Sequence, residues 1–282
     1  MKLSEAIENY LIGLQGIRSK ATVAWYGYML AELKKDMGDE ELKTLGVDRL
    51  RRWRARLFER NYSVWTIRDY LRACRTFFKW LVVERKIKVN PAVRLELPKE
   101  PQRPRLGITE DDRDKILCVA AESPRDLALV YFIGATMCRA GGAAGLRWCD
   151  IDLVRRRALV HEKGDKSREV YFGTETVASL KAWAEVCGSE WVFPSKKGGG
   201  HLSPNGIYQI FERLAERAGV VGSWSPHKWR HGGARGMLKK GANLAQVSQI
   251  LGHKDVSITV RFYGVLDGDE LQDCADSCGW MG

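Results

Sequence analysis

Three prolines in close succession divide this chain. Pro98, Pro101 and Pro104 lie in the stretch LPKEPQRPRL at residues 97–106. Proline fixes one backbone dihedral angle and has no amide hydrogen to donate, so this stretch can form neither a helix nor a central strand. We therefore expect a linker at 97–106 between two domains, because 282 residues are enough for each domain to bury a core of its own.

Residues 1–96 are predicted to form a compact module of four helices. Ser63 is a suitable cap for the last of them, and Asn90-Pro91 prevents the chain from continuing as a helix. Apolar residues recur at steps of three and four in four successive stretches, near residues 3–14, 23–37, 47–61 and 63–81.

The third and fourth of these helices each carry a row of cations. The charges follow one another at steps of three and four, which brings them side by side on one face of the helix. Such rows repel unless an anion neutralises them, so they predict contact with a DNA backbone, with a merely solvated basic face as the alternative. The predicted DNA-binding residues are Arg49, Arg52, Arg56 and Arg60 on the third helix and Arg68, Arg72, Arg75 and Lys79 on the fourth.

The composition agrees with a polyanionic partner and argues against several other classes of protein. The net charge is +11 and the isoelectric point is about 9.3. No apolar run approaches the ~18 residues of a membrane span, so we expect no membrane partner and a cytoplasmic, nucleoid-associated protein. The seven cysteines contain no C-x-x-C pair, and the glycines at 198–200 lack the order of a phosphate-binding loop, so neither a metal nor another cofactor is expected.

The richest group of reactive side chains lies towards the C-terminus. It brings together His227, Arg230, His231, His253 and Tyr263. A phosphodiester under attack gathers negative charge on its non-bridging oxygens, and an enzyme that cuts it without metal needs a guanidinium, imidazoles and an oxygen nucleophile. These residue types therefore predict phosphoryl transfer.

The spacing of this group carries a resemblance to a known family. A His-x-x-Arg-His motif begins at His227, a Leu-Gly-His motif ends at His253, and a Tyr-Gly pair follows at Tyr263. This combination resembles the C-terminal half of the tyrosine recombinases, or phage integrases. The resemblance implies a mainly α fold with a small antiparallel β-sheet, in which a helical, SAM-like core-binding domain at 1–96 precedes a mixed α/β catalytic domain at 107–263. It also implies a site-specific recombinase that cuts and rejoins DNA through a 3′-phosphotyrosyl intermediate without metal or ATP.

The resemblance assigns two arginines and a histidine to the scissile phosphate. Arg139 and Arg230 correspond to the arginines that hold the non-bridging oxygens, and His253 corresponds to a further donor. The sequence departs from the family at Gly142, three residues after the first arginine, where the family usually has an acid that helps to hold the catalytic groups. This departure puts the rate of catalysis in question.

A lysine is expected to protonate the leaving 5′ oxygen. Alternation of polar and apolar residues predicts a β-hairpin at 158–172, with Lys163 at its turn. By resemblance Lys163 is the mobile general acid, and Lys166 is the neighbour with which it could be confused.

The nucleophile is predicted to be Tyr263. It follows His253 by ten residues, whereas many members of the family have nine, and the adjacent Phe262 has no nucleophilic oxygen. By resemblance His227 is the proton acceptor for this tyrosine, and His231 is interpreted as structural support.

The resemblance further implies partners. These are double-stranded DNA with a specific recombination site, a homotetramer assembled on it, and accessory DNA-bending proteins as further candidates. The tail at 264–282 carries five acids and no base, and a short helix near 269–278 is expected to pass to the neighbouring subunit or, alternatively, to fold back on its own. A type IB topoisomerase-like enzyme that nicks and reseals DNA, and a DNA-binding relative that has lost catalysis, stay open as other functions.

Overall fold

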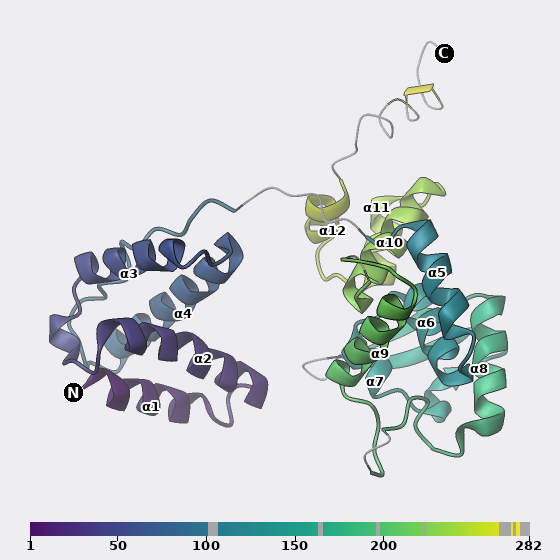
Figure 1. Cartoon of the computed structure of the whole chain (residues 1–282), viewed down its shortest axis with the longest axis horizontal. Helices are drawn as coiled ribbons and strands as arrows, with labels where there is room; N and C mark the ends of the chain where they lie inside the picture. The colour runs from purple at the N-terminus through teal and green to yellow at the C-terminus, as the bar shows by residue number, and fades with distance from the viewer. Residues whose placement is uncertain are drawn as a thin grey trace. The chain divides into compact units, whose positions relative to one another are not determined.

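The computed structural model describes residues 1–100, 107–162, 166–195, 198–222 and 224–264, together with residues 272, 275 and 276 (Figure 1). The fold is mainly α-helical with one small three-stranded antiparallel sheet, which confirms the fold class expected from the sequence. The chain separates into two compact units, Met1–Arg103 and Pro104–Gly282, and each has its own hydrophobic core. The division falls inside the proline-rich stretch, of which residues 101–106 lie outside the described part.

The first unit is a helical module. Ser19 and Ser63 cap its second and fourth long helices, each accepting a hydrogen bond from a backbone amide in the first turn. The buried faces meet around aromatic side chains, with Trp53 and Tyr70 fully enclosed. The elements are α1 (Leu3–Leu14), α2 (Lys20–Met37), the 3-10 turn η1 (Leu42–Thr44), α3 (Val47–Glu59) and α4 (Val64–Val83).

The second unit is built around the apolar helix α6. Ala128, Leu129, Phe132 and Ile133 of this helix are fully buried, as its apolar sequence predicts. Its helices are α5 (Glu110–Ala120), α6 (Pro124–Thr136), α7 (Ala140–Ala144), α8 (Thr174–Cys187), α9 (Pro204–Arg217), α10 (Pro226–Lys239), α11 (Leu244–Leu251) and α12 (Val256–Tyr263), with the 3-10 turn η2 at Trp148–Asp150.

The sheet has the order β1-β2-β3, with both neighbouring pairs antiparallel. The strands are β1 (Ile151–Asp152), β2 (Arg157–Glu162) and β3 (Lys166–Tyr171). Val160 and Val170 point into the core, as the alternating pattern predicts, and Glu162 lies directly opposite Lys166 at the end of the ladder. Residues 163–165 of the turn lie outside the described part, so the structure does not place Lys163.

Two adjacent glycines let α10 approach its neighbours. A Cβ atom on Gly232 would lie 2.8 Å from the carbonyl oxygen of Ile108, and one on Gly233 would lie 2.8 Å from Sδ of Met137. A side chain at Gly232 would push α10 away from the backbone at residues 107–108, whereas one at Gly233 would displace the side chain of Met137 at the end of α6. The glycines therefore set the position of Arg230 and His231, which immediately precede them.

Candidate active site

The first predicted catalytic arginine lies at a helix start. Arg139 is the N-cap of α7, and its guanidinium pairs with the carboxylate of Glu162 at the end of β2. The Arg139 side chain is 53% exposed, whereas that of Glu162 is 10% exposed. Arg168 of β3 approaches the other carboxylate oxygen of Glu162 at 3.6 Å. The exposed guanidinium of Arg139 is therefore held by a largely buried carboxylate that a second arginine shares.

The second predicted catalytic arginine is buried. Arg230 on α10 is 3% exposed and donates hydrogen bonds to the carbonyl oxygens of Met137, at 2.5 Å, and Leu251, at 2.6 Å. Burial, followed by the neighbouring charges of Arg139 and Arg168, lowers the pKa of Arg230 to about 10. The guanidinium therefore stays protonated at neutral pH and is fixed by the ends of α6 and α11.

His253 is placed by the glycine that precedes it. Gly252 ends α11 in the left-handed conformation, with φ +67°, and a Cβ there would clash with the side chain of Arg168. His253 has Nδ1 2.8 Å from Oγ1 of Thr259 and Nε2 3.2 Å from a guanidinium nitrogen of Arg230. The guanidinium can only donate, so Nε2 accepts and Nδ1 carries the proton.

The protonation of His253 follows from its surroundings. Burial, then the charges of Arg230, Arg139 and Arg168, lower its pKa from 6.5 to about 4, against an opposing effect of Glu162. The ring is thus neutral at physiological pH. The sequence assigned His253 to the phosphate as a donor, whereas in this arrangement its Nε2 holds Arg230.

Tyr263, the predicted nucleophile, is the last residue of α12 and is 2% exposed. Its hydroxyl lies 2.5 Å from Nδ1 of His231, which is also buried. His227, one turn earlier on α10, is exposed, and its ring centroid lies 4.6 Å from that of His231. The structure therefore places His231, which was interpreted as structural support, against the hydroxyl that was predicted to lose its proton to His227.

Lys166 is the described lysine of the hairpin. Its pKa is lowered, first by a contact with the ammonium of Lys254 and by that charge, and then by desolvation and Arg139. Lys166 therefore lies in the same positive field as the two catalytic arginine candidates. Lys163, three residues earlier, lies in the part of the turn that the structure does not describe.

The basic row on α3 is not free of acids, contrary to the reason given for it from sequence. Arg56 and Arg60 both pair with the buried carboxylate of Asp36 on α2, at 3.3 and 2.7 Å. Arg60 also pairs with Glu32, and Arg49 with Glu40. Acids from α2 and from the segment after it therefore neutralise three of the four arginines, whereas Arg52 makes no ion pair with any described residue.

The four basic residues on α4 differ in their partners. Arg68 is nearly buried and donates to the carbonyl oxygen of Pro98, while Arg72 pairs with Asp69 at 3.3 Å. Arg75 and Lys79 have no acidic partner among the residues that the structure describes.

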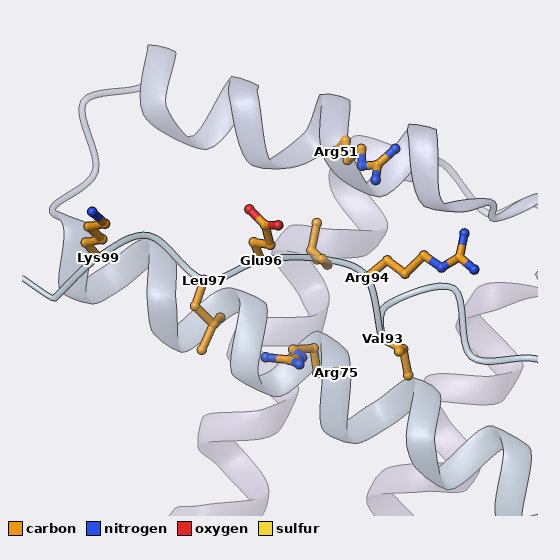
Figure 2. A pocket seen from close by; sticks show the side chains of 8 residues that line it. Arg51, Arg75, Val93, Arg94, Glu96, Leu97 and Lys99 are labelled. Atoms are coloured by element: carbon orange, nitrogen blue, oxygen red, sulfur yellow. The ribbon is translucent and has the colours of Figure 1, made fainter.

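An open cleft of about 720 Å³ in the first unit joins Arg75 to cations that the sequence analysis did not single out (Figure 2). Arg51 reaches it from α3, Arg75 from α4, and Arg94 and Lys99 from the extended segment that follows α4. Arg51 lies outside the row used for prediction, and Arg94 and Lys99 belong to no helix. Helical periodicity could not group these side chains, because they come from one helix and from an extended segment that overlaps the predicted linker.

Comparison with known proteins identifies both units. Residues 107–268 match the phage integrase family, and residues 7–85 match the phage integrase N-terminal SAM-like domain. The chain belongs to the phage integrase family. A tyrosine recombinase XerC from Xanthomonas campestris pv. campestris is 31% identical over 96% of this chain and 87% of the relative. A tyrosine recombinase XerC from Alcanivorax borkumensis is 29% identical over 96% of this chain and 92% of the relative.

Solved structures share the integrase fold at lower sequence identity. A lambda integrase dimer bound to a COC′ core site superposes with a TM-score of 0.78 at 19% identity, covering 92% of this chain and 97% of that one. A lambda integrase tetramer bound to a Holliday junction has the same TM-score at 18% identity, covering 93% and 77%. The XerA recombinase has a TM-score of 0.57 at 22% identity and covers 98% of both chains.

Two absences hold for the described part of this integrase-family chain. Within it, no cluster of three or more histidine, cysteine, aspartate or glutamate side chains has the arrangement of a metal site. No helix in the same residues combines the length and the apolar character that crossing a bilayer requires.

Proposed function

We propose that this protein is a site-specific DNA recombinase that cuts and rejoins DNA through a covalent bond to Tyr263. The observation that carries the proposal is the convergence of Arg139, Arg230, His253 and Tyr263, which come from four separate places in the second unit. The relatives of this chain named tyrosine recombinase XerC support this function, as do the DNA complexes of lambda integrase.

The proposed chemistry transfers a phosphoryl group between two oxygens. The deprotonated oxygen of Tyr263 attacks the scissile phosphorus, the bond to the 5′ oxygen breaks, and a 3′-phosphotyrosyl link remains. Lys163 gives a proton to the leaving 5′ oxygen. A 5′ hydroxyl later attacks the phosphotyrosine and restores a phosphodiester. Because each step exchanges one phosphoester for another, no ATP is required, and the arginines supply the charge stabilisation for which other enzymes use a metal.

The arginines provide the electrostatic part of this mechanism. Arg139 offers an exposed guanidinium, whereas Arg230 already donates to the carbonyl oxygens of Met137 and Leu251 and to His253. A guanidinium has five N–H groups, so Arg230 keeps donors for a phosphate while its plane is fixed. Such preorganised donors stabilise the charge that develops on the non-bridging oxygens.

His231 is the proposed first proton acceptor from Tyr263. Its Nδ1 lies within hydrogen-bonding distance of the phenol oxygen, which is the geometric requirement for a general base. His227, the acceptor expected from the sequence, contacts the His231 ring and stays the alternative. A change in the position of α12 when DNA binds would decide between them.

The first unit is proposed to bind the duplex. Arg52, Arg75 and Lys79, together with the cleft lined by Arg94 and Lys99, offer cations to phosphates. We further propose a homotetramer on paired sites, by analogy with the lambda integrase tetramer on a Holliday junction. The acidic tail at 264–282, which lies largely outside the described residues, is the proposed link between subunits.

A suicide substrate tests this function. A nick placed close to the scissile phosphate lets a short 5′-hydroxyl fragment diffuse away, so a covalent protein–DNA adduct accumulates. Wild-type protein should form an SDS-resistant adduct and then recombine paired sites. An adduct without strand exchange would indicate an enzyme that only nicks and reseals, and duplex binding without any adduct would indicate a protein that has lost catalysis.

A further inference from the structure

Glu162 is the carboxylate that faces the arginines of the active site. It pairs with Arg139 through one oxygen and lies 3.6 Å from Arg168 through the other. Its charge also opposes the effect of these arginines on the pKa values of Arg230 and His253. The side chain is 10% exposed, so water screens these interactions weakly. The guanidinium groups of Arg139, Arg168 and Arg230 thus all interact electrostatically with the largely buried carboxylate of Glu162.

The start of α7 shows what this carboxylate does for Arg139. Arg139 is the N-cap of α7, no side chain caps the helix locally, and its first turn, Ala140-Gly141-Gly142, contains no acid. The third position of a helix is where the acid of a capping box reaches back to the N-cap amide. Here Oε1 of Glu162 lies 3.5 Å from the backbone nitrogen of Arg139 and performs that role from the sheet.

Gly142, at this third position, lies next to the side chain of Glu162. A Cβ atom on Gly142 would lie 3.5 Å from Cγ of Glu162 and 3.4 Å from Cβ of Val160. A Cβ atom at 142 would therefore be in ordinary van der Waals contact with Glu162, and a longer side chain there would lie beside this carboxylate. The first turn of α7 lacks an acid, and Glu162 of β2 places its carboxylate next to that turn.

We infer that Glu162 is the positioning residue for Arg139: it supplies from the β-hairpin the carboxylate that α7 lacks at Gly142. The inference rests on the proposed function, in which Arg139 holds a non-bridging oxygen of the phosphate. Glu162 touches neither the phosphate nor the nucleophile in this role. It fixes the guanidinium of Arg139 and balances the charges of Arg168 and Arg230, which would otherwise repel it.

The first test removes the charge and keeps the shape. Glu162→Gln should slow single-turnover adduct formation on saturating suicide substrate by about 10²-fold, the usual effect of misplacing a catalytic group. The dissociation constant for duplex DNA should change little, because the first unit also binds. Glu169→Gln is the matched control, since Glu169 lies on the same hairpin but is exposed and pairs with Arg157.

The second test moves the carboxylate to the other element. Glu162→Ala should be as slow as Glu162→Gln, and the double variant Gly142→Glu with Glu162→Ala should recover most of the rate. Gly142→Glu alone should not improve the wild-type protein, because two carboxylates would then lie beside each other. Rescue across two elements would not occur if Glu162 merely stabilised the hairpin.

An NMR measurement that does not depend on catalysis separates this inference from the proposed function. The guanidinium ¹⁵N–¹H resonances of Arg139, assigned with Arg139→Lys, should be resolved in the wild-type protein, broadened in Glu162→Gln and restored in the double variant. Unchanged resonances, or a wild-type rate in Glu162→Gln, would overturn the inference while adduct formation by Tyr263 still stood. If the wild-type protein formed no adduct, the proposed function would fail and these resonances would still decide whether Glu162 positions Arg139.

Discussion

The hydroxyl of Tyr263 lies 2.5 Å from Nδ1 of His231, and both side chains are buried. The contact joins the end of α12 to α10, which also carries Arg230. His253 makes a second link between the same regions, because it contacts Thr259 of α12 and Arg230. The nucleophile and the groups that would hold the phosphate are therefore connected through two histidines without DNA.

Tyr263→Phe should abolish covalent attachment to DNA and leave duplex binding nearly intact. The substitution removes the nucleophilic oxygen but no charge, and the ring stays in the buried apolar cluster that includes Met137 and Leu251. SDS gels of suicide-substrate reactions and gel-shift titrations measure the two properties. Phe262→Tyr in the Tyr263→Phe background should not restore the adduct, since one residue rotates the side chain by about 100° on a helix. An adduct in Tyr263→Phe would refute the assignment of the nucleophile.

Substituting the two histidines of α10 separately decides which one accepts the proton. His231→Ala should reduce single-turnover cleavage by roughly 10²–10⁴-fold, the usual contribution of a positioned base. His227→Ala should have a smaller effect, because Nδ1 of His231 lies 2.5 Å from the hydroxyl, whereas His227 lies one turn earlier on α10 with its ring centroid 4.6 Å from that of His231. The pH dependence of cleavage should lose its acidic limb in the variant that removes the base. A larger loss in His227→Ala would favour the acceptor expected from the sequence.

Lys163→Ala should slow cleavage by roughly 10²–10⁴-fold if Lys163 is the general acid. A 5′-bridging phosphorothiolate should restore most of the rate, since sulfur leaves without needing a proton. Lys166→Ala is the control, because Lys166 lies at the same end of the hairpin and has a lowered pKa next to Lys254. Rescue of Lys166→Ala in place of Lys163→Ala would transfer the role to Lys166.

Much of the fold was predictable because local patterns determine it. The helices of the first unit and the β2–β3 hairpin follow from apolar periodicity and alternation, which the packed structure preserves. The third helix ends at Glu59, two residues before the predicted end, because Asn61 adopts a left-handed conformation with φ 55°. Helix α7 could not be predicted from periodicity, since its five residues of alanine and glycine show none.

The site was predictable in its residue types but not in its partners. Arg230 donates to Met137, 93 positions earlier in the chain, and Arg139 pairs with Glu162 across 23 positions. Periodicity describes one helix at a time, so it could not show that Asp36 of α2 neutralises arginines of α3. For the same reason periodicity could not show that His231 lies against the hydroxyl of Tyr263 at the end of α12.

The two kinds of arginine in the first unit should respond differently to substitution. Arg52→Ala, Arg75→Ala and Lys79→Ala remove cations without an acidic partner among the described residues, so each should weaken binding to specific and random DNA alike. Each lost phosphate contact should reduce the slope of log K against log salt by about 0.9. Arg60→Ala is the contrasting variant, because it leaves the buried carboxylate of Asp36 with fewer partners. Arg60→Ala should therefore lower the free energy of unfolding. An unchanged salt slope in the other three variants would exclude their side chains as phosphate contacts.

His253 should make the stability of the second unit depend on pH. Its pKa is about 4 in the folded protein and 6.5 as a reference for the unfolded chain. Between these values the unfolded state binds more protons than the folded state, so protonation favours unfolding. The stability associated with the neutral ring is therefore complete above pH 6.5, declines as the pH falls, and is fully lost below about 4.

Urea denaturation at several pH values between 7.5 and 4.5 measures this dependence. His253→Gln should be less stable than the wild-type protein at pH 7.5, because it weakens the contacts with Arg230 and Thr259. Its free energy of unfolding should then decline less steeply with falling pH, since the titrating ring is gone. His161→Gln is the control, because His161 is exposed on β2 and should keep the wild-type slope. Equal slopes in the wild-type protein and His253→Gln would show that the folded state does not hold His253 neutral, and that its ring does not accept a hydrogen bond from Arg230.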